Sequence, residues 1–115
     1  MINYHITSKG DKIAEVLPGS DMISSADDIL DLIAEASFND SNKIIVHSQS
    51  LHPDFFDLKT KLAGEILQKF SNYRMKLAII GGFSSVKSRS LNDFIRESNK
   101  WGTISFVDSL EKVLS

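Results

Sequence analysis

Hydrophobic and polar residues alternate at the start of the chain, as in strands that expose one face to solvent. This pattern predicts a first strand over residues 2–7, and residues 13–17 predict a second strand that ends at Pro18-Gly19. Turn-forming residues occupy positions 8–12, between the two. We therefore expect an antiparallel β-hairpin at the amino-terminal end.

Two later segments, residues 43–48 and 75–80, are mostly apolar and too short to be helices. Their composition predicts strands buried on both faces, which are typical of parallel sheets. Gly81-Gly82 ends the second of them. Residues 103–107 predict a last strand. The longer segments between these strands have apolar residues at helical spacing, which predicts connecting helices.

The first of these helices is predicted over residues 25–37, where Ser25 and Asp28 have the spacing of a capping box and Phe38 continues the apolar series. Residues 58–70 have the most regular helical periodicity in the chain. Two further helices are expected, one opening at Ser90 and a short one near the end of the chain, after Asp108.

The expected order of elements is ββαβαβαβα. Strands separated by helices form right-handed parallel crossovers, so we expect an open α/β sheet with helices packed on it, in one domain over residues 1–115. Trp101 is expected to anchor the core, and Phe55 and Phe56 either tuck under the sheet edge or form an exposed lip. The predicted core cluster comprises Ile45, Leu62, Ile66, Phe70, Ile79 and Phe94.

Composition agrees with a soluble globular protein, since 42% of residues are hydrophobic and 24% are charged. The absence of cysteine excludes disulfides and thiolate chemistry. No apolar run approaches the ~20 residues that span a bilayer, and the amino-terminal residues do not resemble a signal peptide. We therefore expect a cytoplasmic protein with no membrane partner.

Charge is distributed unevenly along the chain. Acidic residues predominate over residues 11–57 and basic residues over residues 58–100, while the net charge is only −2. The simplest interpretation is a chance difference between solvated faces, and the alternative is a basic face that attracts anions or an acidic partner. The small net charge gives no basic footprint for nucleic acid, so no nucleic-acid partner is expected.

Two segments resemble an uncharacterised bacterial family, catalogued as domain of unknown function 4180. They are residues 55–74, which begin Phe-Phe-Asp-Leu-Lys-Thr, and residues 93–100, which read Asp-Phe-Ile-Arg-Glu-Ser-Asn-Lys. This resemblance implies no particular activity.

The order of elements also resembles that of STAS domains, the anti-sigma-factor-antagonist-like fold. STAS regulators carry a serine that a partner kinase phosphorylates, between the third strand and the second helix. Thr60 stands at this place with Asp57 three residues earlier, although Lys61 replaces the glycine of the motif. The resemblance thus implies a STAS-like fold, a regulatory role and a phospho-switch at Thr60 and Asp57.

Ligands of parallel sheets gather beyond the carboxyl ends of the strands. The predicted loops there supply hydroxyl, imidazole and basic groups suited to an anion, namely Ser48, Ser50, His52, Ser84, Lys87 and Arg89. The alternative is a mobile surface loop with a solvated basic tip.

The histidines do not have the spacing of a metal motif, so ordinary hydrogen-bonded or solvent-facing histidines are expected, with no metal and no cofactor. No residue pattern identifies a catalytic group.

Two functions remain open. The first is a small regulatory module that binds a protein partner or itself. The second is a binder or hydrolase of a small anionic molecule at the carboxyl ends of the strands, for which converging side chains in a concave rim would be required.

Overall fold

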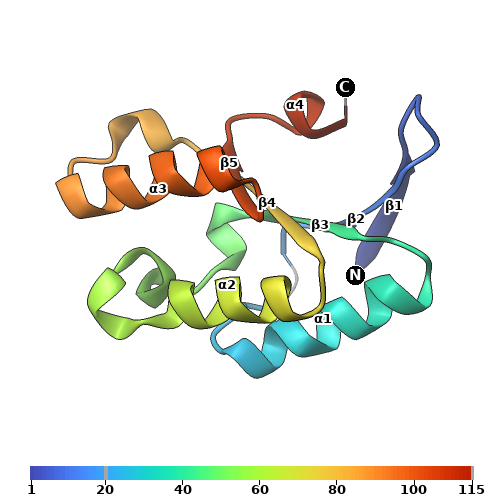
Figure 1. The fold of residues 1–115 in the computed structure, drawn as a ribbon, viewed down its shortest axis with the longest axis horizontal. Coiled ribbons are helices and arrows are strands. Elements are labelled where there is room, and N and C mark those ends of the chain that lie inside the picture. Colours follow the sequence, from blue (N-terminus) through green and yellow to red (C-terminus); the bar gives the residue numbers. More distant parts are fainter. Residues whose placement is uncertain (20, 115) are drawn as a thin grey trace.

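A computed structural model describes residues 1–19 and 21–114. It has an α/β fold with a five-stranded mixed sheet, in which a hairpin precedes parallel strands (Figure 1). The strands are β1 (Ile2–Ile6), β2 (Lys12–Val16), β3 (Lys43–His47), β4 (Lys76–Ile80) and β5 (Ile104–Val107). The helices are α1 (Ala26–Phe38), α2 (Leu62–Asn72), α3 (Arg89–Trp101) and α4 (Leu110–Leu114), and short 3₁₀ turns follow β3 and β4.

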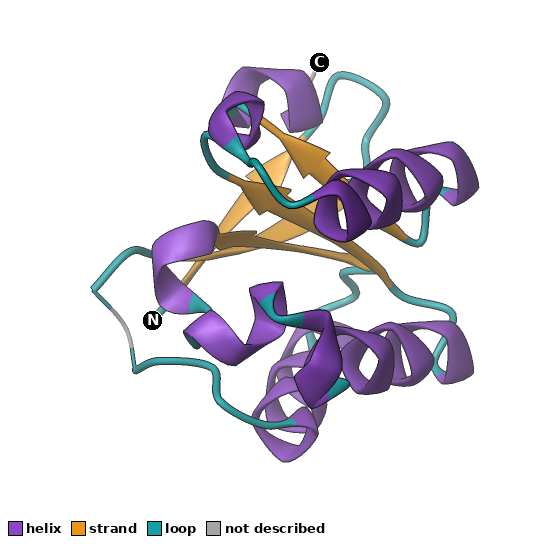
Figure 2. Ribbon diagram, turned by 90° about the vertical axis from the view of Figure 1, so that its left-hand side faces the viewer, coloured by secondary structure: helices purple, strands orange, loops and turns teal. Residues whose placement is uncertain are grey.

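The strands lie in the sheet in the order in which they occur along the chain. β1 pairs antiparallel with β2, and each later strand pairs parallel with its predecessor. When every crossover is right-handed, a sequential order places consecutive helices on the same face of the sheet. Accordingly α1 and α2 lie on one side and α4 lies on the other (Figure 1), with the twisted sheet between them (Figure 2).

The main core fills the space between the sheet and helices α1 and α2. Ile44, Val46, Leu77 and Ile79 point from the central strands into this cluster, where Phe70 of α2 is fully buried. α3 joins the same core beside β5, where the ring of Phe94 lies 6.1 Å from that of Phe106. Phe55 is fully buried and Phe56 partly buried, as expected for rings that tuck inward.

A second, smaller cluster lies on the opposite face, beneath α4. It consists of Ile13, Ile45, Ala78 and Val113. The expectation of a single cluster containing Ile45 is therefore wrong. Because side chains alternate along a strand, Ile45 points away from its neighbours Ile44 and Val46, which belong to the main core.

Helix starts depend on details of the backbone. The capping box at Ser25 and Asp28 is confirmed. The helix expected from residue 58 starts only at Leu62, because Lys61 adopts the left-handed conformation with φ of 67° and separates a 3₁₀ turn from α2. α3 starts at Arg89, and its cap is Ser88 rather than Ser90.

Two aromatic side chains expected in the core lie in solvent. Phe38 is 87% exposed because it follows the buried Ala36 by two residues and so faces away from the buried stripe of α1. Trp101 is 82% exposed at the last position of α3, before the left-handed Gly102. Among the described residues, no helix has the length and apolar character to cross a bilayer.

Candidate functional site

Five of the six residues predicted to form an anion site lie in the two loops that follow β3 and β4, and the sixth, Arg89, is the first residue of α3. The loops meet where Gly81 packs against Ser48, so closely that a Cβ at position 81 would lie 2.5 Å from Ser48 Oγ. Ser50 is buried, and His52 is occupied locally, since its Nδ1 accepts from the N–H of Asp54 at 3.0 Å.

The second loop and the start of α3 contribute only exposed side chains to this group; they belong to Ser84, Lys87 and Arg89. The structure therefore brings Ser48 to the second loop, while the remaining predicted residues are either held by local contacts or directed into solvent.

Thr60 and Asp57 lie ahead of α2, and both side chains bind the backbone. The Thr60 hydroxyl lies 2.6 Å from the Asp54 carbonyl and 2.8 Å from the Asp57 carbonyl, and it accepts from the N–H of Leu62. Asp57 accepts from the N–H of Lys59 at 3.2 Å. These contacts close the 3₁₀ turns before α2, so the hydroxyl of Thr60 has a structural use although the residue is exposed.

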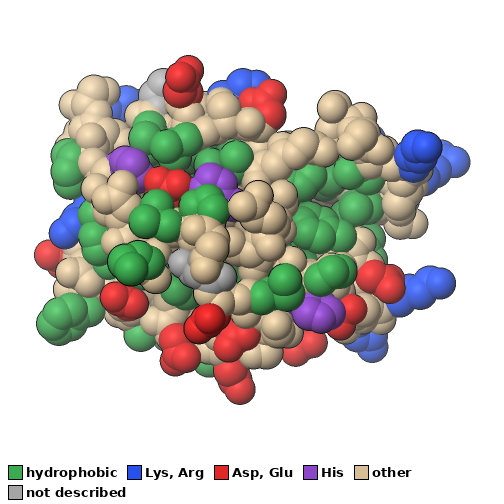
Figure 3. All heavy atoms as spheres, turned by 180° about the vertical axis from the view of Figure 1, so that it is seen from behind, with side chains coloured by type: hydrophobic (Ala, Val, Ile, Leu, Met, Phe, Trp, Pro, Cys, Tyr) green, Lys and Arg blue, Asp and Glu red, His purple; other side chains and the backbone are tan. Residues whose placement is uncertain are grey.

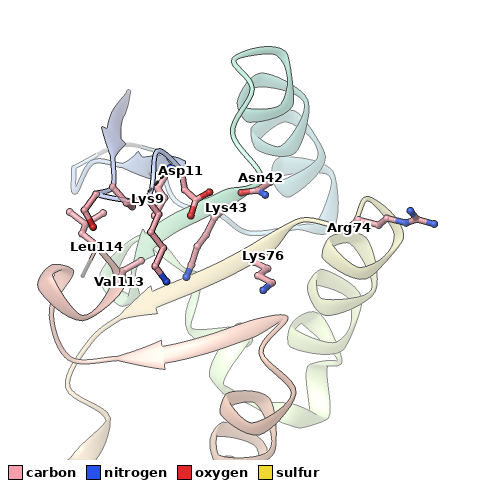
Figure 4. Close-up of a pocket in the computed structure, with 11 residues that line it drawn as sticks. Lys9, Asp11, Asn42, Lys43, Arg74, Lys76, Val113 and Leu114 are labelled. Carbon is pink, nitrogen blue, oxygen red and sulfur yellow. Dashed lines mark hydrogen bonds between the residues drawn. The ribbon is translucent and has the colours of Figure 1, made fainter.

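A cationic cavity of about 270 Å³ lies at the opposite end of the strands, where β3 and β4 begin. It is bounded by the hairpin turn, by the first residues of both strands and by the end of α4. Its lining includes Lys9, Asp11, Asn42, Lys43 and Lys76. Lys9 and Lys43 direct their amino groups to the same region, and Arg74 points away from it (Figure 4).

The lysines of this cavity are unusually placed for a sheet. Lys43 and Lys76 are direct cross-strand partners, so two like charges lie side by side. Burial, together with the neighbouring charge of Lys76, lowers the pKa of Lys43, and Asp11 opposes this effect in part. Within residues 1–19 and 21–114, the amino groups of Lys9, Lys43 and Lys76 form no ion pair or hydrogen bond.

A second polar cluster lies on the sheet face that carries α4, outside the area that α4 contacts. Glu15 of β2 is only 6% exposed, and it bridges two histidines from the flanking strands. Its Oε1 lies 2.7 Å from Nε2 of His5, and its Oε2 lies 2.7 Å from Nε2 of His47. On this face two histidine side chains are visible on either side of a carboxylate, among hydrophobic side chains (Figure 3).

The protonation of this cluster follows from its hydrogen bonds. Burial by itself raises the pKa of Glu15, but the hydrogen bonds and charges of His47 and His5 outweigh burial and lower it. An ionised carboxylate only accepts hydrogen bonds, so both Nε2 atoms carry the hydrogen and both Nδ1 atoms keep a lone pair when the rings are neutral. Neither Nδ1 atom has a hydrogen-bond partner among the described residues. Within those residues, Tyr4 Oη is the only buried side-chain polar atom that lacks a hydrogen-bond partner. Both Nδ1 atoms are therefore not buried, and they reach solvent.

Neither of these two sites is predicted by the sequence pattern. Glu15 could have been suspected as the one charged residue inside the apolar segment 13–17, and the lysines as the residues that open two apolar strands. Their convergence depends on strand order and register, which periodicity does not supply. All three histidines form hydrogen bonds, as expected, and no group of three potential ligands among the described residues has a geometry that could hold a metal ion.

No curated protein and no solved structure matches the chain. Residues 8–115 match the family described as Domain of unknown function (DUF4180). Because this match covers nearly the whole chain, the protein belongs to the DUF4180 family.

Proposed function

We propose that this protein binds a small anionic ligand, such as a phosphorylated or carboxylated metabolite, in the cationic cavity at the amino ends of β3 and β4. The observation that carries the proposal is that Lys9, Lys43 and Lys76 line one cavity without an ion-pair partner among the described residues. The proposed anion site therefore lies at the amino ends of the strands, whereas the sequence pattern predicted one at their carboxyl ends. We propose that the protein acts in the cytoplasm.

Electrostatics supports an anion at this position. Like charges directly opposite each other on neighbouring strands destabilise a sheet, so the fold gains nothing from pairing Lys43 with Lys76. An anion between the amino groups would replace this repulsion with charge-assisted hydrogen bonds. The partial burial of Lys43 strengthens the effect, since a half-buried charge is screened less by solvent.

The other lining groups fit a small polar molecule with donors of its own. The Asp11 carboxylate and the Asn42 carbonyl oxygen can accept hydrogen bonds from ligand hydroxyl or amino groups. Val113 and Leu114 of α4 add an apolar wall. A cavity of about 270 Å³ suits a metabolite rather than a polymer.

Thermal stability in the presence of anions tests the proposal. Phosphate and pyrophosphate are expected to raise the Tm more than chloride at matched ionic strength, because ligands that bind the folded state stabilise it. A Lys9→Gln/Lys43→Gln variant is expected to bind pyrophosphate about tenfold more weakly or worse, as measured by calorimetry, through the loss of charge-assisted hydrogen bonds.

A Lys87→Gln/Arg89→Gln variant is the matched control, since it removes two cations from the loop after β4 and the start of α3. It should respond to phosphate like the wild type. If instead this control loses the response and the cavity variant keeps it, the anion binds at the carboxyl ends of the strands. An equal response of all three proteins would remove both sites.

A second candidate function is the regulatory interaction module implied by the resemblance to STAS domains. Exposed aromatic side chains favour it: Phe38 and Tyr73 line a groove with Leu30 and Met75 between the ends of α1 and α2. Light scattering tests self-association through this groove. A dimer that Phe38→Ser and Tyr73→Ser convert to monomer would support the module, while a wild-type monomer at all concentrations would exclude self-association as its mode.

A further inference from the structure

We infer that His5, Glu15 and His47 form a general-base centre that hydrolyses uncharged esters with apolar acyl groups, on the sheet face that carries α4. This activity is separate from anion binding, since the two sites share no residue. Lys43, which lines the cavity, precedes His47 by four residues, or about 13 Å along β3.

The arrangement of hydrogen bonds is that of an oriented base. Each imidazole directs its Nε2–H to the buried carboxylate of Glu15 at 2.7 Å, which fixes the tautomer and the orientation of the ring. The opposite nitrogen, Nδ1, is then the proton acceptor and reaches solvent. A carboxylate that orients an imidazole and stabilises the imidazolium has the same role in catalytic triads.

The strands determine what surrounds this base. His47 is paired in register with Ile80, and Ile80 with Val107, so the three side chains form a row on one face of the sheet. Ile80 and Val107 are partly buried, and like Leu110 of α4 they pack against the smaller core cluster. A substrate whose carbonyl lies at His47 Nδ1 would therefore place its acyl chain on an apolar strip.

Charge narrows the substrate class further. The ionised Glu15 lies beside both imidazoles and repels anions. Basic groups on this face lie at the other end of the strands, at Lys43 and Lys76, and in α4 Lys112 is paired with Asp108 at 2.8 Å. Glu111 of α4 is a further exposed acid. An uncharged ester with an apolar acyl chain is favoured over a phosphate or a carboxylate.

The reaction needs only water as co-reactant. A water oxygen attacks the ester carbonyl carbon while His47 Nδ1 takes a proton from that water. The tetrahedral intermediate then breaks its bond to the alcohol oxygen, and the proton on Nδ1 passes to that oxygen. The products are a carboxylic acid and an alcohol. Glu15 keeps its negative charge throughout and acts as a positioning residue, and His5 holds the second carboxylate oxygen and offers an equivalent Nδ1.

Hydrolysis of p-nitrophenyl butyrate tests the inference in the full chain. We expect turnover with a kcat/KM that falls at least tenfold in a His5→Gln/His47→Gln variant, consistent with the contribution of a general base. His52→Gln is the matched control, because it removes a histidine that lies outside the cluster, and it should retain the wild-type rate. Butyrate is expected to react faster than acetate, and p-nitrophenyl phosphate should not react.

Glu15→Gln tests positioning separately from chemistry. It leaves both imidazoles in place, and we expect a lower kcat with a nearly unchanged KM, because the rings lose the carboxylate that orients them. Replacement by Asp should restore part of the rate. A Glu15→Gln protein with the wild-type kcat would show that the carboxylate has no part in the reaction.

Circular dichroism and intact mass complete the test. If Glu15→Gln fails to fold, the single variants His5→Gln and His47→Gln take its place, because each keeps one hydrogen bond to the carboxylate. A lower kcat/KM in a folded single variant would then support the inference, and wild-type values in both would contradict it. The inference is overturned if the folded double-histidine variant reacts at the wild-type rate, if His52→Gln abolishes the reaction, or if intact mass shows lysine acylation in place of turnover.

Discussion

Glu15 illustrates how single side chains acquire their properties from neighbouring strands. A carboxylate that is almost fully buried is ordinarily costly, and its pKa would rise from burial alone. Two histidines from different strands reverse this effect, and the pKa of Glu15 is lowered. The carboxylate thereby connects β1, β2 and β3 through side chains, in addition to their backbone ladders.

The lowered pKa of Glu15 predicts how stability depends on acidity. A carboxyl group whose pKa is lower in the folded state contributes stability above its unfolded value, here 4.5, and this contribution disappears as the pH falls through the folded value. Urea unfolding of the wild type should therefore lose stability more steeply below pH 4.5 than that of Glu15→Gln. At pH 7 the variant should be about 1–3 kcal/mol less stable, because the amide cannot accept from both imidazoles equally. Parallel pH profiles for the two proteins would contradict this account.

Thr60 gives a second prediction about a single side chain. Its hydroxyl joins two carbonyls and the N–H of Leu62, so Thr60→Val should cost about 1–2 kcal/mol in urea unfolding although the residue is exposed. Thr60→Glu should cost at least as much. The neighbouring Lys59→Ala is a control without such contacts from its side chain.

The expected loss of stability in Thr60→Glu also tests the phospho-switch expected at Thr60. Phosphorylation would remove the proton that the hydroxyl donates and would loosen the turn before α2. If Thr60→Glu proved as stable as the wild type, the turn would tolerate charge and the switch would gain support.

Among the secondary-structure elements, α1 has the most complete start. The Ser25 hydroxyl accepts from the N–H of Asp28, and the Asp28 carboxylate accepts from the N–H groups of Ser24 and Ser25. Several N–H groups that the first turn would leave unpaired are thus satisfied. The edge of β5 is protected in a similar way, since Asn99 of α3 accepts from the N–H of Phe106 at 2.7 Å.

The capping box predicts different effects of neighbouring substitutions. Ser25→Ala should lower the stability by about 1 kcal/mol, and Asp28→Ala by somewhat more, because its carboxylate accepts from two N–H groups. Ser24→Ala should be nearly neutral, since Ser24 contributes only its backbone N–H. Thermal unfolding followed by circular dichroism measures all three. A loss in Ser24→Ala equal to that in Asp28→Ala would show that the box does not carry the effect.

For the molecule as a whole, the sequential order of strands has the largest consequence. It collects the connecting helices around one core and leaves the opposite face to α4 alone. Both candidate sites lie on that less covered face, one at each end of the parallel strands. A sheet with connecting helices on both faces would have covered the lysines and histidines that these sites use.

The centre of this architecture is Ile79 of β4, which is fully buried in the main core. Ile79→Ala should cost about 2–5 kcal/mol, from lost burial and the cavity left behind. Ile80→Ala is the matched control on the opposite face, where the side chain is only partly buried, and it should cost less than half as much. Equilibrium unfolding in urea compares them, and equal losses would indicate that the two faces are packed alike.

The sequence by itself determined the fold class, the strands, the helix cap at Ser25 and most of the core. These depend on local propensity and periodicity, which a single chain displays directly. It could not place Phe38, because periodicity does not show which face of a helix meets the core, or Trp101, because periodicity does not show where a helix extends beyond its core. It also could not find either site. Lys43 meets Lys76, and Glu15 meets His5 and His47, through pairing between strands that lie far apart in the chain. That pairing is decided by strand order and register, so only the tertiary structure brings these charges together.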